Sequence, residues 1–115
     1  MERLSNADFH LLGTDLELTK YILKNSLLHV DIEGGPVHLA SQLGTKCVVL
    51  FGATDIQYYA FGKNINIVSE VCNSCYMAWD NNSQCLLGGK EPLCMLSITP
   101  QKVFDVTYRY LRSLE

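Results

Sequence analysis

Residues 46–51 (KCVVLF) carry the strongest strand signal in this chain of 115 residues. Successive side chains of a strand point to opposite faces, so an unbroken apolar run requires that both faces be covered. Strands of this kind occur in parallel sheets that have helices on each side. The chain must therefore supply further parallel strands and the helices that connect them.

Two further strands and three helices fit this requirement. The apolar run at residues 27–31 (LLHVD) is typical of a buried strand, and residues 65–68 (INIV) form a third strand. Helices are expected at residues 15–25, 36–43 and 100–112. Because helices and strands alternate with connections too long for hairpins, we predict an α/β fold, a short parallel sheet flanked by helices.

Residues at the expected helix ends support these boundaries. Thr14 and Glu17 have the spacing of a capping box, in which each side chain satisfies an amide at the helix start. Gly44 suits the exit of the second helix. In the last helix, Thr99 is the expected cap and Pro100 the first helical residue.

Composition places the chain among ordinary globular domains. It is 48% hydrophobic and 18% charged with a net charge of -3, which argues against disorder and against nucleic acid as a partner. Residues 1–115 suffice for one domain. The first twenty residues have neither the apolar run of a signal peptide nor that of a membrane span, so we expect a cytoplasmic protein. Leu114 and Glu115 are consistent with a tag remnant.

The turn after the first strand has the features of a phosphate-binding loop. Gly34 and Gly35 lack side chains where a helix begins, so backbone amides can approach an anion. Pro36 has no N–H, which leaves the amides of Gly35, Val37 and His38 as the expected cradle. The alternative is that the glycines only serve a tight turn and that His38 is a bystander. His29, which lies between apolar residues, is expected to be structural.

Three linked motifs carry a family resemblance. Residues 33–40 (EGGPVHLA), 43–45 (LGT) and 48–54 (VVLFGAT) occur in the order found in family 9 glycosyltransferases, the ADP-heptose:lipopolysaccharide heptosyltransferase group. The chain resembles their C-terminal domain over about residues 10–112. The resemblance implies a GT-B enzyme, in which two Rossmann-like domains close over a cleft and the C-terminal domain binds the nucleotide-sugar donor.

The resemblance also assigns site residues. It implies that Glu33, Gly35 and His38 hold the diphosphate and nearby hydroxyls of the donor, with Thr54 on the opposite side of the cleft. The family's usual aspartate is Glu33 here, and its hydroxyl residue is Gly34. These departures leave the identity of the sugar open.

A part of the family's enzyme has no counterpart in this sequence. The N-terminal acceptor-binding domain and its catalytic carboxylate are not matched, nor are the first strands of the donor domain. Because those strands continue the sheet in the family, the resemblance implies that one edge of the sheet remains unpaired here. We therefore expect a partial C-terminal nucleotide-sugar-binding domain with no catalytic residue of its own, inactive in isolation. The resemblance requires no cofactor, and it places the complete enzyme in bacterial lipopolysaccharide or surface-glycan synthesis, at the inner face of the membrane.

A cysteine-rich segment, residues 72–94, shows no regular period and is expected to be a long structured loop. Its four cysteines suit either a zinc ion or buried thiols, and the wide spacing of the second pair leaves both open; they are Cys72, Cys75, Cys85 and Cys94. Cys47 is expected in the core. A zinc-clipped interaction module without sugar chemistry is the alternative function.

Three aromatic residues suit either stacking on a base or the core; they are Tyr58, Tyr59 and Phe61.

Overall fold

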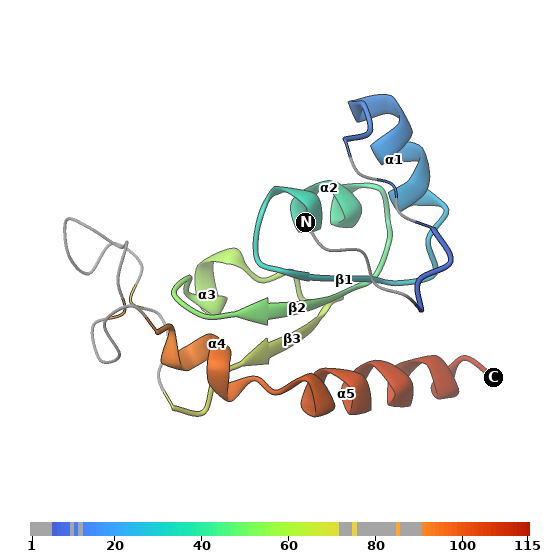
Figure 1. The fold of residues 1–115 in the computed structure, drawn as a ribbon. Helices are drawn as coiled ribbons and strands as arrows, with labels where there is room; N and C mark the ends of the chain where they lie inside the picture. The colour runs from blue at the N-terminus through green and yellow to red at the C-terminus, as the bar shows by residue number, and fades with distance from the viewer. Residues whose placement is uncertain (1–5, 10, 12, 72–74, 76–84, 86–90) are drawn as a thin grey trace.

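The computed structural model describes residues 6–9, 11, 13–71, 75, 85 and 91–115. Its sheet contains β1 (His29–Ile32), β2 (Cys47–Phe51) and β3 (Ile65–Val68) in the order β1-β2-β3, and both neighbouring pairs are parallel (Figure 1). The predicted α/β class and the three-stranded parallel sheet are confirmed. The predicted strand positions are correct to within two residues.

Helices cover both faces of the sheet. On one side lie α1 (Leu16–Lys24), α2 (Gly35–Gln42) and α3 (Ile56–Tyr59), and on the other lie α4 (Leu93–Ser97) and α5 (Pro100–Ser113) (Figure 1). Each side has its own apolar cluster. The first is built around Cys47, Val49 and Phe51 of β2, and the second around Val48, Ile67 and Ile98. The central strand thus contributes to both clusters, as its unbroken apolar run requires.

The first strand departs from its prediction. A buried strand was expected, but Val30 is 45% exposed and Ile32 is 56% exposed. Both residues lie on the α5 side, where their register partners are Val48 and Leu50 of β2. Val48 is fully buried there, whereas Val30 is not, so α5 covers the middle of the sheet and leaves β1 open. Among the strands of the described residues, β1 and β3 each pair with β2 alone, so both are outer strands.

Side-chain caps begin α1, α3 and α5, and the cap of α1 differs from the predicted one. The capping box predicted at Thr14 is wrong: the N-cap of α1 is Asp15, whose Oδ1 accepts a hydrogen bond from Leu18 N–H at 2.8 Å. The Oγ1 atom of Thr14 lies 2.6 Å from that of Thr19 instead. Thr99 caps α5 as predicted, accepting from Lys102 N–H.

Two short helices were not expected. α3 is a single turn that Asp55 caps, and α4 occupies the end of the segment predicted to be a loop. Of residues 72–90, only Cys75 and Cys85 belong to the described residues. Within the described ranges, no helix has the length and apolar character needed to cross a bilayer.

Candidate functional site

The candidate site begins where β1 ends. Glu33 extends the pairing of β1 by one residue, since its N–H donates to the carbonyl of Leu50 at 3.0 Å. Gly34 then continues in an extended conformation and forms the N-cap of α2 without a side-chain hydrogen bond, and Pro36 occupies the first turn. Strand, glycine turn and helix start therefore follow one another as the sequence predicted.

The two glycines are not required by the turn itself. Gly34 has an extended φ of 167°, and neither it nor Gly35 lies in the left-handed region that favours glycine. A Cβ atom at Gly35 would meet nothing within 4 Å, and one at Gly34 would meet only Pro36 Cδ at 4.0 Å. The backbone conformation and the packing would accept a side chain at both positions. The structural explanation for this pair, that a tight turn needs glycine, does not hold here.

Glu33 and His38 are brought together across the turn. His38 Nε2 lies 3.0 Å from Glu33 Oε1, and because a carboxylate only accepts hydrogen bonds, Nε2 carries the hydrogen. The Glu33 side chain is 13% exposed and that of His38 is 46% exposed. The ring of His38 also meets Phe61 edge to face, with centroids 5.2 Å apart. Two contacts thus orient an imidazole that is still accessible to a ligand.

The predicted amide cradle is smaller than expected. The N–H of His38 donates to the carbonyl of Gly34 at 3.3 Å, so it closes the first turn of α2. Val37 is only 1% exposed, because its side chain enters the core beneath α2. Gly35 and His38 are both exposed residues, so Gly35 is the one of the three whose residue is exposed and whose amide does not close the helical turn. The site therefore consists of that amide, the His38 ring and the partly accessible Glu33 carboxylate.

Thr54 lies at the carboxyl end of β2, the strand next to β1. Parallel neighbours end at the same edge of a sheet, so the turn that holds Thr54 and the turn that holds Glu33 lie at one edge. Thr54 is half-buried. The following residue, Asp55, is engaged in capping α3, where its Oδ1 accepts from Gln57 N–H at 2.8 Å.

The far end of α2 is fixed by a buried polar cluster. Asn64 Nδ2 donates to Ser41 Oγ at 3.0 Å, and Asn64 Oδ1 accepts from the N–H of Cys47 at 3.0 Å. Lys63 Nζ donates to the carbonyl of Ser41. These bonds connect α2 to β2 and to the residues before β3. Sequence reasoning missed this cluster, although Asn64 directly precedes an apolar strand and is buried.

The cysteines divide between core and cysteine-rich segment. Cys47 lies in the core as predicted, and burial raises the pKa of its thiol. Cys94 is buried in α4, whereas Cys75 and Cys85 are half-buried, and Cys72 lies outside the described residues. Among the residues with described placement, no three metal-ligating side chains form a group. Zinc binding by the four predicted ligands therefore stays a prediction.

The aromatic residues near the site differ in their exposure. Tyr58 is exposed on α3, while Phe61 is half-buried against His38. Stacking on a base stays a prediction for the tyrosines, and Phe61 has a packing role.

Comparison of the chain with protein-family models, with curated proteins and with solved structures finds no match.

Proposed function

We propose that this chain is the donor-binding portion of a glycosyltransferase of the GT-B type. In this proposal, Glu33, Gly35 and His38 contact the diphosphate and hydroxyls of a nucleotide sugar, an ADP-heptose or a similar donor. Thr54 lines the same cleft from the neighbouring strand. A separate acceptor domain supplies the catalytic base.

The observation that carries the proposal is the Glu33–His38 pair beside glycines that the fold does not require. The 3.0 Å contact directs one donor of the ring to the carboxylate, which fixes the imidazole at the start of α2. The start of a helix carries partial positive charge and favours anions. Glycines without a conformational or packing requirement leave room for a ligand to approach the backbone.

Transfer itself needs a base within hydrogen-bond reach of the acceptor hydroxyl. Glu33 is engaged with His38 and is proposed to bind the donor, so it does not serve as this base. The isolated chain is therefore proposed to bind nucleotides without transferring a sugar. With half of the cleft, affinity on the order of millimolar is expected, equivalent to about 4 kcal/mol.

Amide chemical shifts during titration with ADP and with UDP test this function. Shifts are expected at residues 33–38 and 52–55. The His38→Ala variant should bind about tenfold more weakly, since it loses one hydrogen bond to a charged group. Shifts confined to other parts of the chain contradict the proposal.

His29→Ala is the matched control. His29 is also paired with a carboxylate, since its Nε2 lies 3.2 Å from Asp31 Oδ2, but it lies in the strand rather than at the helix start. Its replacement should leave nucleotide binding unchanged. Equal losses in the two variants would show that the site is not at α2.

A further inference from the structure

The contact between His38 and Glu33 determines which ring nitrogen a ligand can use. The Nε2–H of His38 donates to Glu33 Oε1, and the ring of Phe61 packs edge to face against the same imidazole. Among the described residues, no hydrogen bond is formed by Nδ1, although nearly half of the side chain is exposed. Nδ1 is therefore the ring nitrogen that remains for a ligand at the start of α2.

A diphosphate places a specific demand on Nδ1. The ionised oxygens of a diphosphate ester accept hydrogen bonds and donate none. A neutral imidazole carries a single hydrogen, and here that hydrogen is on Nε2, so Nδ1 presents a lone pair that repels a phosphate oxygen. With a second hydrogen on Nδ1, the ring becomes an imidazolium and donates from both nitrogens. A phosphate oxygen can therefore bond to this ring only in its charged form.

We propose that His38 binds the diphosphate as an imidazolium, so that binding of the donor is coupled to uptake of a proton at Nδ1. This role rests on the proposed function and names the charge state in which His38 acts. The proton comes from the solvent, and no bond of the donor forms or breaks. A neutral ring, by contrast, would use Nδ1 to accept a hydrogen bond from a hydroxyl group of the donor.

The charges that meet in the complex favour the added proton. The Glu33 carboxylate lies 3.0 Å from the ring, and the diphosphate of a nucleotide sugar adds its own negative charges. The start of a helix offsets about half an elementary charge. An imidazolium between the carboxylate and a phosphate adds a full positive charge and donates a charge-assisted hydrogen bond to each of them.

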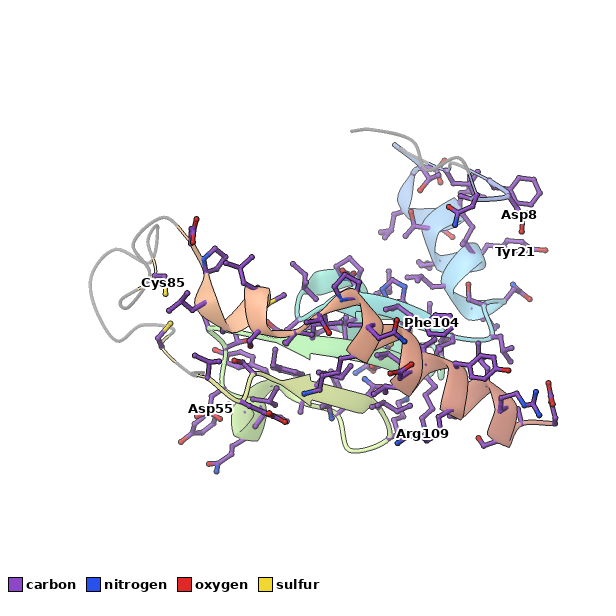
Figure 2. The ribbon with its side chains drawn as sticks, turned by 60° about the horizontal axis from the view of Figure 1, so that its bottom comes forward. Asp8, Tyr21, Asp55, Cys85, Phe104 and Arg109 are labelled. Atoms are coloured by element: carbon purple, nitrogen blue, oxygen red, sulfur yellow. The ribbon has the colours of Figure 1, made fainter. Side chains whose placement is uncertain are left out.

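Other titratable groups on the neighbouring elements bond elsewhere. Asp55, at the start of α3 (Figure 2), accepts a hydrogen bond from Gln57 N–H. Lys63 Nζ donates to the carbonyl of Ser41 at the far end of α2. The remaining titratable groups of β1, β2 and α3 are His29, Asp31, Cys47, Tyr58 and Tyr59. Within the described residues, Glu33 is the charged group in contact with the His38 ring.

The pH dependence of ADP-glucose binding, followed by amide chemical shifts, tests the coupling. Both phosphates of this nucleotide sugar are esterified, so its charge is constant in the range used, whereas the terminal phosphate of ADP titrates near about pH 6. Histidine changes its charge between about pH 6 and about pH 8.5. Over this range the affinity of the parent should fall about tenfold, the factor expected for one charged hydrogen bond.

Two variants assign the pH dependence to one histidine. His38→Ala, with its fold checked by circular dichroism, should bind ADP-glucose at every pH as weakly as the parent does at high pH. His29→Ala should keep the full pH dependence, because His29 pairs with Asp31 within β1. An affinity of the parent that is constant or rises with pH overturns the coupling and leaves the proposed function intact, as does loss of the pH dependence in His29→Ala. Absence of ADP-glucose binding at every pH overturns both.

Nitrogen-15 spectra of the histidine side chains observe the proton directly. In the neutral ring of the ligand-free protein, the hydrogen should be on Nε2, as the contact with Glu33 requires. Near neutral pH, ADP-glucose should increase the share of His38 rings that carry hydrogen on both nitrogens, because binding and protonation favour each other by the same factor. The spectrum of His29 should not respond. A His38 ring that keeps a single hydrogen in the complex, as it would if Nδ1 accepted from a hydroxyl group, contradicts the coupling.

Discussion

At the scale of single residues, Gly52 shows a glycine fixed by packing. Its φ angle lies outside the left-handed region, but a Cβ atom there would lie 2.9 Å from Cys94 Sγ and 3.0 Å from Met95 Sδ. Gly52→Ala should therefore lower the free energy of unfolding by about 1–3 kcal/mol, because the sulfur atoms must shift. Chemical denaturation measures this loss.

Two variants control the Gly52 experiment. Gly62→Ala introduces a Cβ with nothing within 4 Å and should change stability by less than about 0.5 kcal/mol. In the Gly52→Ala background, Cys94→Ala removes the nearest sulfur and should cost less than it does alone. A Gly52→Ala protein as stable as the parent would show that α4 does not rest on this turn.

The burial of Cys47 should make the free energy of unfolding fall as the pH becomes alkaline. Burial raises the pKa of its thiol, so the folded protein keeps the proton at pH values where the unfolded chain loses it. Its contribution is complete below the ordinary thiol pKa of about 8.5 and is lost as pH rises through the folded-state value. Denaturation midpoints from pH 7 upwards should fall more steeply for the parent than for Cys47→Ala. Parallel curves would contradict this.

The sequence predicted much of the site, but not which amides a ligand can reach. The proximity of Glu33 and His38 follows from a strand end, a short turn and one helical turn. The burial of Val37 was missed, although Val37, Ala40 and Ser41 have the i, i+3, i+4 spacing of a buried helix face. The amide of a residue in the first helical turn lacks a partner within the helix, but its side chain can still point into the core. At Val37 the side chain does so, and the residue is buried.

At the scale of elements, two neighbouring residues, Thr14 and Asp15, are candidates for the N-cap of α1. Asp15→Ala should lower the free energy of unfolding by about 1 kcal/mol, since it removes the acceptor for Leu18 N–H. Thr14→Ala should cost less, because Thr14 bonds to the Thr19 hydroxyl and caps no amide. Urea denaturation of both variants checks the order. The reverse order would restore the capping box that the sequence suggested.

The elements that the sequence missed are those with little periodicity to detect. α3 has four residues and α4 has five, too few for a helical repeat of apolar positions. α4 also follows a glycine- and asparagine-containing segment that favours a loop assignment. Its position depends on a distant contact, the close approach of Cys94 to Gly52, which local sequence does not contain.

At the scale of the whole molecule, the order of elements determined the sheet. An apolar central strand and alternating helices leave few arrangements other than a parallel sheet. The sequence did not identify which apolar run is exposed. Residues 27–31 are as apolar as many buried strands, and only the placement of α5 over β2 and β3 leaves Val30 and Ile32 accessible.

Among the described cysteines, Cys47 and Cys94 are buried, one in the central strand and the other in a short peripheral helix. Cys47 is in the central strand, where exposure requires the sheet to come apart, whereas Cys94 is in a five-residue helix held by Gly52 and by the 2.7 Å contact between Ser69 Oγ and Ser97 Oγ. Short peripheral helices open more often than a central strand. A thiol reagent under native conditions should therefore modify Cys94 well before Cys47, as peptide mass spectrometry can follow. Equal rates would mean that the chain opens only as a unit. The protein thus carries its own chemical probes for partial opening and for complete unfolding.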